Sequence, residues 1–178
     1  FAGSGTTYTF DVLRGSSDGT VTVNIAAAKA TDAATNPNSA SNTYNLTIDT
    51  TGPTVSITSS VSSGSTTSSA TLSYTATFSE FVSDFDATDI TISGTANGGN
   101  PIINNFAGSG STYTFDVFKG SSDGTVIVSI DSAKATDAAT NPNSISNTYN
   151  LTIDSTGSSV EIISSTSSDS TTSSTTLS

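Results

Sequence analysis

The residues that could do chemistry in this chain are carboxylates and side-chain amides. The sequence has 15 Asp and Glu residues against four Lys and Arg, and it has no His and no Cys. These absences exclude Ser-His-Asp and Cys-His nucleophiles and the ordinary zinc and copper sites. Paired carboxylates could catalyse alone only with a substrate platform, which an aromatic-poor chain lacks, so we expect no catalytic residue and no enzyme activity. Oxygen ligands suit Ca²⁺ instead, because it takes six to eight of them in irregular geometry.

The candidate metal ligands fall into three stretches. Asp49 lies in "TIDTTGP", Glu80 lies in "SEFVSDFDATD", and Asp137 lies in "TDAATNPN". Two carboxylates 4 Å apart repel by on the order of 4 kcal/mol at an effective dielectric constant near 20, so converging acids should hold a cation between them. Lys134 is the one local positive charge. The predicted calcium ligands are Asp49, Glu80, Asp84, Asp86, Asp137 and Asn141, with Glu80, Asp49 and Asp137 ranked first.

Each of these acids also has a plain structural interpretation. Asp137 could form an Asx-turn, Asp86 and Asp89 could be solvated or cap a turn, and Asp49 could be an ordinary linker residue. Asp123 precedes a glycine in "SSDGT", where we expect a turn residue.

An internal repeat organises the chain. Residues 1–73 and 106–178 align without a gap at a constant offset of 105, and 57 of the 73 positions are identical. We therefore expect tandem units of about 105 residues. Residues 1–49 would be the C-terminal part (strands E to G) of a preceding repeat, residues 50–154 a complete repeat, and residues 155–178 strand A and the start of strand B of a following one.

The complete repeat shows the period-2 alternation of β-strands, interrupted by Gly, Ser, Asn and Asp. Seven strands in about 100 residues are typical of an immunoglobulin-like β-sandwich, here without disulfides, so the predicted fold class is all-β. "SSDGT" predicts a tight E–F hairpin turn, and "SAKATDAAT" a loop rather than a helix. The predicted strands A to G are residues 54–59, 70–79, 89–93, 102–106, 112–118, 125–131 and 148–154.

This topology brings the acidic stretches together. In an immunoglobulin-like sandwich, strand A enters at the end that carries the B–C and F–G loops. The linker acid Asp49 should then meet Glu80 of the B–C segment and Asp137 of the F–G segment. A bound Ca²⁺ there would fix the angle between consecutive units.

The strings "TYTFDV", "SSDGTVIVSI", "ATDAATNPNS", "SNTYNLTIDSTG" and "FSEFVSDFDATDITISG" resemble the bacterial Ig-like repeats of giant surface adhesins and biofilm-associated proteins. The resemblance covers essentially the whole chain and implies an extracellular stalk module, often rigidified by calcium, with Asp49, Glu80 and Asp137 as matching ligands. The chain has Phe81 where the family often has Pro, Thr140 where it often has Gly, and Ser158 in place of a linker Pro.

The predicted function is a non-enzymatic spacer in a long extracellular adhesin or fibre on a bacterial surface, with neighbouring repeats of the same chain as its partners. Two alternatives stay open: lateral or end-to-end self-association into a filament, and glycan or protein binding through the B–C and F–G loops, where Phe81 is a candidate contact. A net charge of −11 argues against nucleic acid as a partner, and the lack of an apolar run of about 18 residues argues against membrane insertion.

Overall fold

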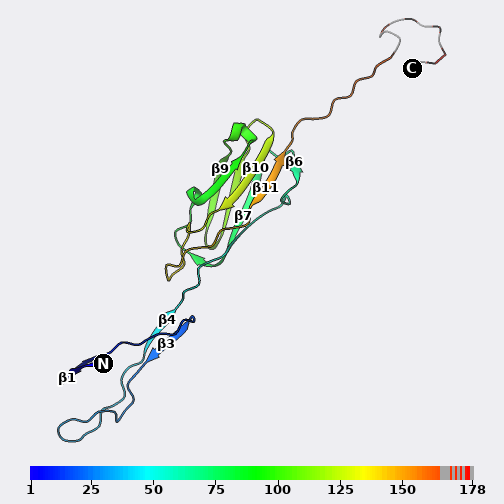
Figure 1. The fold of residues 1–178 in the computed structure, drawn as a ribbon. Helices are drawn as coiled ribbons and strands as arrows, with labels where there is room; N and C mark the ends of the chain where they lie inside the picture. The colour runs from blue at the N-terminus through cyan, green and yellow to red at the C-terminus, as the bar shows by residue number, and fades with distance from the viewer. Residues whose placement is uncertain (165–168, 170, 172, 174, 177–178) are drawn as a thin grey trace.

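The computed structural model describes residues 1–164, 169, 171, 173, 175 and 176. Its regular structure is almost entirely β, as the alternating sequence predicts (Figure 1). The elements are β1 (Ala2–Ser4), β2 (Thr7–Thr9), β3 (Gly19–Val23), β4 (Tyr44–Ile48), β5 (Val55–Ser59), β6 (Thr66–Thr67), β7 (Thr71–Val82), the short 3-10 helices η1 (Ala87–Asp89) and η2 (Ala96–Gly99), β8 (Ile90–Gly94), β9 (Ile102–Phe118), β10 (Gly124–Ile130) and β11 (Tyr149–Ile153).

Strands β5 to β11 form a two-sheet sandwich. One sheet has the order β5-β7-β9 and the other has the order β6-β11-β10-β8. The alternating apolar side chains of both sheets point inward, which removes their surface from water and provides the main stabilisation of the fold. The largest fully buried side chains include Tyr74, Phe115, Ile57, Leu72, Ile130 and Leu151. The apolar residues that alternate along the predicted strand B (Leu72, Tyr74, Ala76, Phe78) and the predicted strand F (Val126, Val128, Ile130) are all buried.

The long strand β9 combines the predicted strands D and E by folding back on itself. The Asn105 side chain donates a hydrogen bond to Asp116 Oδ2 at 2.8 Å, and the Thr114 hydroxyl lies 3.5 Å from Ala107 O. In the first copy of the repeat the same residues form the separate strands β1 and β2, which pair antiparallel.

The predicted E–F hairpin is wrong. Strands β9 and β10 belong to different sheets, so the residues between them, 119–123, cross from one sheet to the other. An Asp-Gly pair indicates a tight change of direction, but it does not say whether the two flanking strands pair with each other.

Strand β6 was not predicted. It pairs in parallel with β11, so the entering segment is divided: β5 joins one sheet and β6 joins the other. Gly64 N donates to Asn150 O at 2.6 Å, and Asn150 N donates to Ser63 Oγ at 3.0 Å. Two residues in a Ser/Thr-rich stretch carry no alternation from which a strand could be predicted.

The segment "SAKATDAAT" is a loop, as predicted. Asn143, which is 1% exposed, accepts hydrogen bonds from Lys134 N and Ala135 N at 2.7 and 2.8 Å. Asn38 accepts the same two bonds from Lys29 N and Ala30 N, at 2.7 and 2.8 Å. The loop therefore forms identically in both copies of the sequence.

Two segments lie beyond opposite ends of the sandwich (Figure 1). Residues 1–49 contain the hairpin β1–β2 and the antiparallel pair β3–β4; β2, β3 and β4 overlap the equivalents of the predicted strands E, F and G, whereas β1 was not predicted. At the other end, residues 158–164 are exposed and lie in no strand; the rest of the predicted A and B strands of a following repeat falls largely outside the described residues.

Candidate functional site

Three of the predicted ligands converge at the end of the sandwich that receives the linker. Asp49, Glu80 and Asp137 each offer a carboxylate oxygen, and these oxygens all lie within 4.8 Å of one another. Asp49 follows β4, Glu80 lies near the end of β7, and Asp137 lies in the loop between β10 and β11. This is the meeting of linker, B–C segment and F–G segment that the topology predicts.

The linker is bonded to the sandwich at this point. The Asn141 side chain donates to Asp49 O at 3.2 Å, and Ser144 N donates to Pro53 O at 2.9 Å. Gly52 packs so closely on the F–G loop that a Cβ atom there would lie 2.0 Å from Pro142 O. Residues 49–53 are thereby held against the loop that carries Asp137.

Asp137 is positioned by its own turn. Its Oδ1 accepts from Ala139 N at 2.8 Å and Asn141 N at 2.9 Å, and its Oδ2 accepts from Asn141 Nδ2 at 2.9 Å. The Asx-turn expected as a structural interpretation is therefore present. Asp32 makes the same bonds to Ala34 and Asn36, so the sequence forms this turn locally in both copies.

The cluster perturbs the ionisation of its members. The pKa of Glu80 is raised above its ordinary value by burial and by the negative charges of Asp137 and Asp49. Burial is the largest influence on the pKa of Asp137 and raises it, but the hydrogen bonds from Asn141, Ala139 and Thr140 together lower that pKa below its ordinary value. Glu80 is thus a member of the cluster whose charged form is disfavoured relative to a free glutamate.

Two of the other predicted ligands, Asp84 and Asp86, lie outside the acidic cluster. Asp84 accepts from Thr136 N and Thr136 Oγ1, both at 2.8 Å, and so ties the B–C segment to the F–G loop. Asp86 and Asp89 form a capping box on η1, in which Asp86 Oδ1 accepts from Thr88 N at 2.7 Å. Neither Asp84 nor Asp86 belongs to the acidic cluster, whereas Asn141 contacts two of its members.

A second carboxylate contact, which was not predicted from the sequence, lies at the opposite end of the unit. Asp123 is not only a turn residue: its Oδ1 accepts from Ser155 N at 3.0 Å and its Oδ2 accepts from Thr156 Oγ1 at 2.8 Å. These bonds hold the chain that leaves β11. The nearly buried ammonium of Lys119 lies 3.2 Å from Asp123 Oδ1 and completes the contact.

Asp18 makes the equivalent contact on the linker. It accepts from Thr50 N at 2.8 Å and from Thr51 Oγ1 at 2.6 Å. A signal was present in the sequence, because two hydroxyl residues follow the aspartate after each final strand, in "DTTG" and again in "DSTG". The short linker therefore makes two contacts that involve carboxylates. Thr50 and Thr51 donate hydrogen bonds to Asp18, and Asp49 belongs to the acidic cluster.

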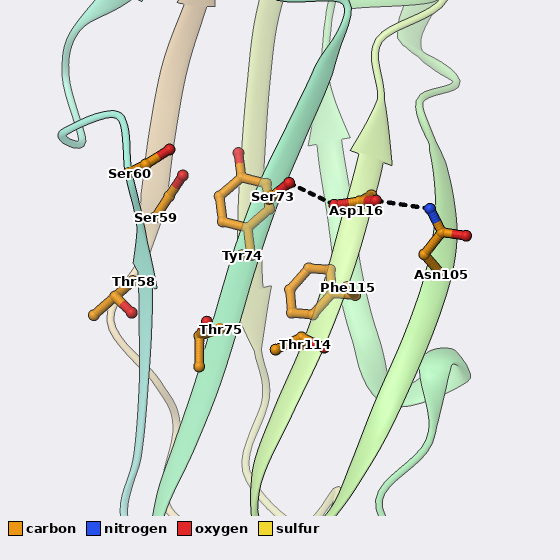
Figure 2. A pocket seen from close by; sticks show the side chains of 10 residues that line it. All are labelled: Thr58, Ser59, Ser60, Ser73, Tyr74, Thr75, Asn105, Thr114, Phe115 and Asp116. Atoms are coloured by element: carbon orange, nitrogen blue, oxygen red, sulfur yellow. Dashed lines mark hydrogen bonds between the residues drawn. The ribbon is translucent and has the colours of Figure 1, made fainter.

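A polar hollow lies on the outer face of the β5-β7-β9 sheet (Figure 2). Asp116 accepts from Ser73 Oγ at 2.6 Å and from Asn105, and hydroxyl groups line much of the remaining wall. The two aromatic residues at its floor, Tyr74 and Phe115, are buried in the core and offer no ring face for stacking on a sugar. Phe81 is 63% exposed, and its ring would lie 3.4 Å from a Cβ atom at Gly110.

The architecture and the linker site define a class of protein: a disulfide-free immunoglobulin-like sandwich that is joined to neighbouring sequence through acidic loops. A comparison with protein families gives the same answer, since residues 49–153 match the family model described as "Bacterial Ig-like domain". The chain belongs to the bacterial Ig-like domain family.

Comparisons with curated proteins and with solved structures return no match. Among the described residues, no helix has the length and apolar character needed to span a membrane.

Proposed function

We propose that this chain is a non-enzymatic structural spacer of a long, repetitive extracellular surface adhesin or fibre, in which Ca²⁺ stiffens the joint between consecutive units. The observation that carries the proposal is the convergence of Asp49, Glu80 and Asp137 where the linker enters the sandwich. The family, whose domains are typically exposed at the cell surface, and the internal repeat support a role in which length grows with the number of units.

The donor set suits a calcium ion. A carboxylate has about four lone-pair positions, and the three hydrogen bonds to Asp137 leave one of them on Oδ2. Glu80 has no competing hydrogen bond among the described residues, and the side-chain amide of Asn141 lies within hydrogen-bond distance of Asp49 O and Asp137 Oδ2. Backbone carbonyls and water would complete the six to eight ligands that Ca²⁺ takes.

A cation at this point would act on the joint because its ligands come from both sides. Asp49 directly follows β4 and so belongs to the linker, whereas Glu80 and Asp137 belong to the sandwich. Binding would neutralise the repulsion between the carboxylates and limit rotation of the linker.

The test compares the 178-residue chain in millimolar Ca²⁺ and in chelator, by thermal unfolding and small-angle X-ray scattering. We expect Ca²⁺ to raise the melting temperature and to narrow the distribution of molecular dimensions. Glu80→Gln should abolish both effects, and in chelator it should stabilise the unit because it removes a repelled charge. Equal melting temperatures and equal scattering in the two conditions would refute the calcium joint.

A matched control lies within the same chain. Asp137→Asn keeps an Asx-turn former but removes a ligand charge, so it should weaken the response to calcium. Asp32→Asn makes the same change in the equivalent turn, where the described residues hold no acidic cluster, and it should leave the response intact.

A further inference from the structure

The two sheets of the sandwich differ in how their edges are protected. Their four edges are formed by β5, β9, β6 and β8. An edge strand presents unpaired N–H and C=O groups that can bond to another chain, so proteins blunt it with a very short strand, a bulge, a proline, a charge or a covering group. Three of the four edges here have such a device, and β8 has none.

The edge of β5 is covered by a side chain. Asn147 Oδ1 accepts from Ile57 N at 2.7 Å, and Asn147 Nδ2 donates to Ile57 O at 3.0 Å, so both main-chain groups of Ile57 are satisfied. Strand β6 is only two residues long. The outer part of β9 follows Pro101 and is interrupted by Asn105, whose φ of 52° lies in the left-handed region. These three edges are therefore poor templates for another strand.

Strand β8 presents an open edge. Its five residues include no charge and no proline, and no described strand pairs with its outer side. Thr95 N donates to Thr125 O at 3.0 Å, and the bonds of an antiparallel pair involve alternate residues, so Thr91 and Ser93 also bond to β10. The N–H and C=O of Ile92 therefore point away from β10, toward the open side.

This edge is complementary to a second copy of itself. If Ile92 lies opposite Ile92 of the second copy, the two residues exchange both of their main-chain hydrogen bonds about a twofold axis. Thr91 of each copy then faces Ser93 of the other on the outer surface, where both side chains are exposed. A hydroxyl pair directly opposite across two strands is favourable, and no charge is buried.

The charges beside β8 favour the antiparallel direction. Asp86 and Asp89 lie at η1, just before the strand, whereas η2, which follows the strand, has the sequence "ANGG" and no charge. In an antiparallel pair, the acidic η1 of one copy lies beside the uncharged η2 of the other. A parallel pair would bring two acidic η1 segments together, and their carboxylates would repel.

We propose that two copies of the complete unit pair edge to edge through β8, antiparallel and centred on Ile92, so that their β6-β11-β10-β8 sheets join into one. Strand β10, the neighbour of β8, runs lengthwise in the sandwich (Figure 1), so the paired units lie side by side and point in opposite directions. One such contact is small, but a chain with several units repeats it, and the contacts reinforce one another along two chains.

This inference goes beyond the proposed function. Strand β8, η1 and η2 all lie within the family match at residues 49–153, so the pairing involves neither end of the chain. It also uses none of Asp49, Glu80 and Asp137. Chelator is present in every measurement below, so the outcome does not depend on whether calcium binds.

The test traps the pair with a disulfide, for which the chain offers a clean background because it has no Cys. Residues directly opposite on one face of an antiparallel pair have Cβ atoms about 4.5–5.5 Å apart, close enough for a disulfide with a small adjustment, whereas diagonal neighbours lie about 7–8 Å apart. The Thr91→Cys chain and the Ser93→Cys chain are mixed with oxidised glutathione. We expect mostly the mixed dimer and little of either symmetric dimer, because residue 91 meets residue 93 and not itself.

A matched control uses the covered edge. Ser56 and Thr58 flank Ile57 of β5 as Thr91 and Ser93 flank Ile92, and their side chains are also exposed. A mixture of the Ser56→Cys and Thr58→Cys chains should give far less mixed dimer, because Asn147 occupies the main chain of that edge. An unchanged melting transition in each variant verifies that the unit is folded.

Amide hydrogen exchange tests the unchanged chain. The N–H of Ile92 faces the open side, so it should exchange readily in dilute solution and become protected as the concentration rises to the millimolar range. The N–H of Ser93 faces β10 and should be protected at every concentration.

The proposal is overturned if the protection of Ile92 does not change with concentration. It is equally overturned if the mixture of the Thr91→Cys and Ser93→Cys chains gives no more mixed dimer than the control mixture, or if symmetric dimers predominate, which would indicate another register or another surface.

Discussion

Asp123 holds the backbone of Ser155 through a hydrogen bond of 3.0 Å from Ser155 N to Oδ1. The two residues are 32 positions apart, and the contact joins the connection between the sheets to the chain that leaves β11. Asp18 and Thr50 form the same contact at 2.8 Å. Each copy of the sequence thus uses one carboxylate to direct its outgoing chain, and in the complete unit this contact lies at the end opposite the acidic cluster.

Replacing Asp123 by Ala should destabilise the complete unit. The change removes the acceptor for Ser155 and Thr156 and leaves the nearly buried Lys119 ammonium without its carboxylate partner. We expect the melting temperature to fall by on the order of 5 °C or more, measured by circular dichroism. Asp18→Ala makes the identical change outside the sandwich and should not shift the transition; an equal effect of the two substitutions would contradict this assignment.

The lowered pKa of the same residue, Asp123, should make the unit less stable at acidic pH. Hydrogen bonds from the Ser155 and Thr156 side chains, then from Ser155 N and Lys119, hold the pKa of Asp123 far below its ordinary value. A lowered pKa contributes stability above the ordinary value, near 4, and that contribution is lost as the pH falls toward the folded-state pKa. The free energy of unfolding of the unchanged chain, measured by urea titration, should therefore fall below about pH 4. In the Asp123→Asn variant this fall should be smaller.

Glu80 should act with the opposite sign in the absence of calcium. Its pKa is raised, so folding favours its protonated form, and the stability linked to that proton disappears as the pH rises through the raised value. Urea unfolding in chelator should show this decline for the unchanged chain and not for Glu80→Gln. A decline of the same size in the variant would exclude Glu80 as its source.

Gly52 should not tolerate a side chain. A Cβ atom would lie 2.0 Å from Pro142 O, so Gly52→Ala must push the linker away from the F–G loop. We expect a loss of about 1–3 kcal/mol in the free energy of unfolding, typical of overpacking, together with a weaker response to calcium. Gly157 occupies the equivalent position with nothing within 4 Å, so Gly157→Ala is the matched control and should be silent in urea titrations.

At Thr140 we expect the opposite effect: a substitution that introduces glycine should stabilise the unit. Its φ of 67° lies in the left-handed region, which is unfavourable for a β-branched side chain and natural for glycine. The side chain is exposed, so Thr140→Gly loses little packing, and it should stabilise the unit by on the order of 0.5–1 kcal/mol after the entropy of glycine in the unfolded chain is counted. Thr35→Gly, at φ 69° in the first copy, should leave the same unfolding midpoint unchanged.

The sequence predicted those parts of the fold that follow from alternation. The inward faces, exemplified by Leu72, Phe115 and Leu151, come from period-2 patterns that a two-sheet core requires. Convergence of Asp49, Glu80 and Asp137 followed from topology, because the entry point of strand A and two loops share one end of the sandwich.

The features of the fold and of the site that could not be predicted from the sequence depend on contacts between residues far apart in the chain. Asp84 looks equivalent to Glu80 along the chain, yet it accepts a hydrogen bond from Thr136, which lies 52 positions away. The contact of Asp123 with Ser155 and the pairing of β6 with β11 likewise join segments with no shared periodicity.

The parallel pairing of β6 with β11 also sets how the unit responds to tension. Tension would enter from the N-terminal side of β6 and leave from the C-terminal end of β11, so it pulls two adjacent strands past each other along their length. The bonds from Gly64 N to Asn150 O, from Thr152 N to Ser65 O and from Asp154 N to Thr67 O then share the load in shear and must break together, instead of opening one after another. A module pulled from both ends is thereby protected against unfolding by the pairing of β6, a strand only two residues long, with β11.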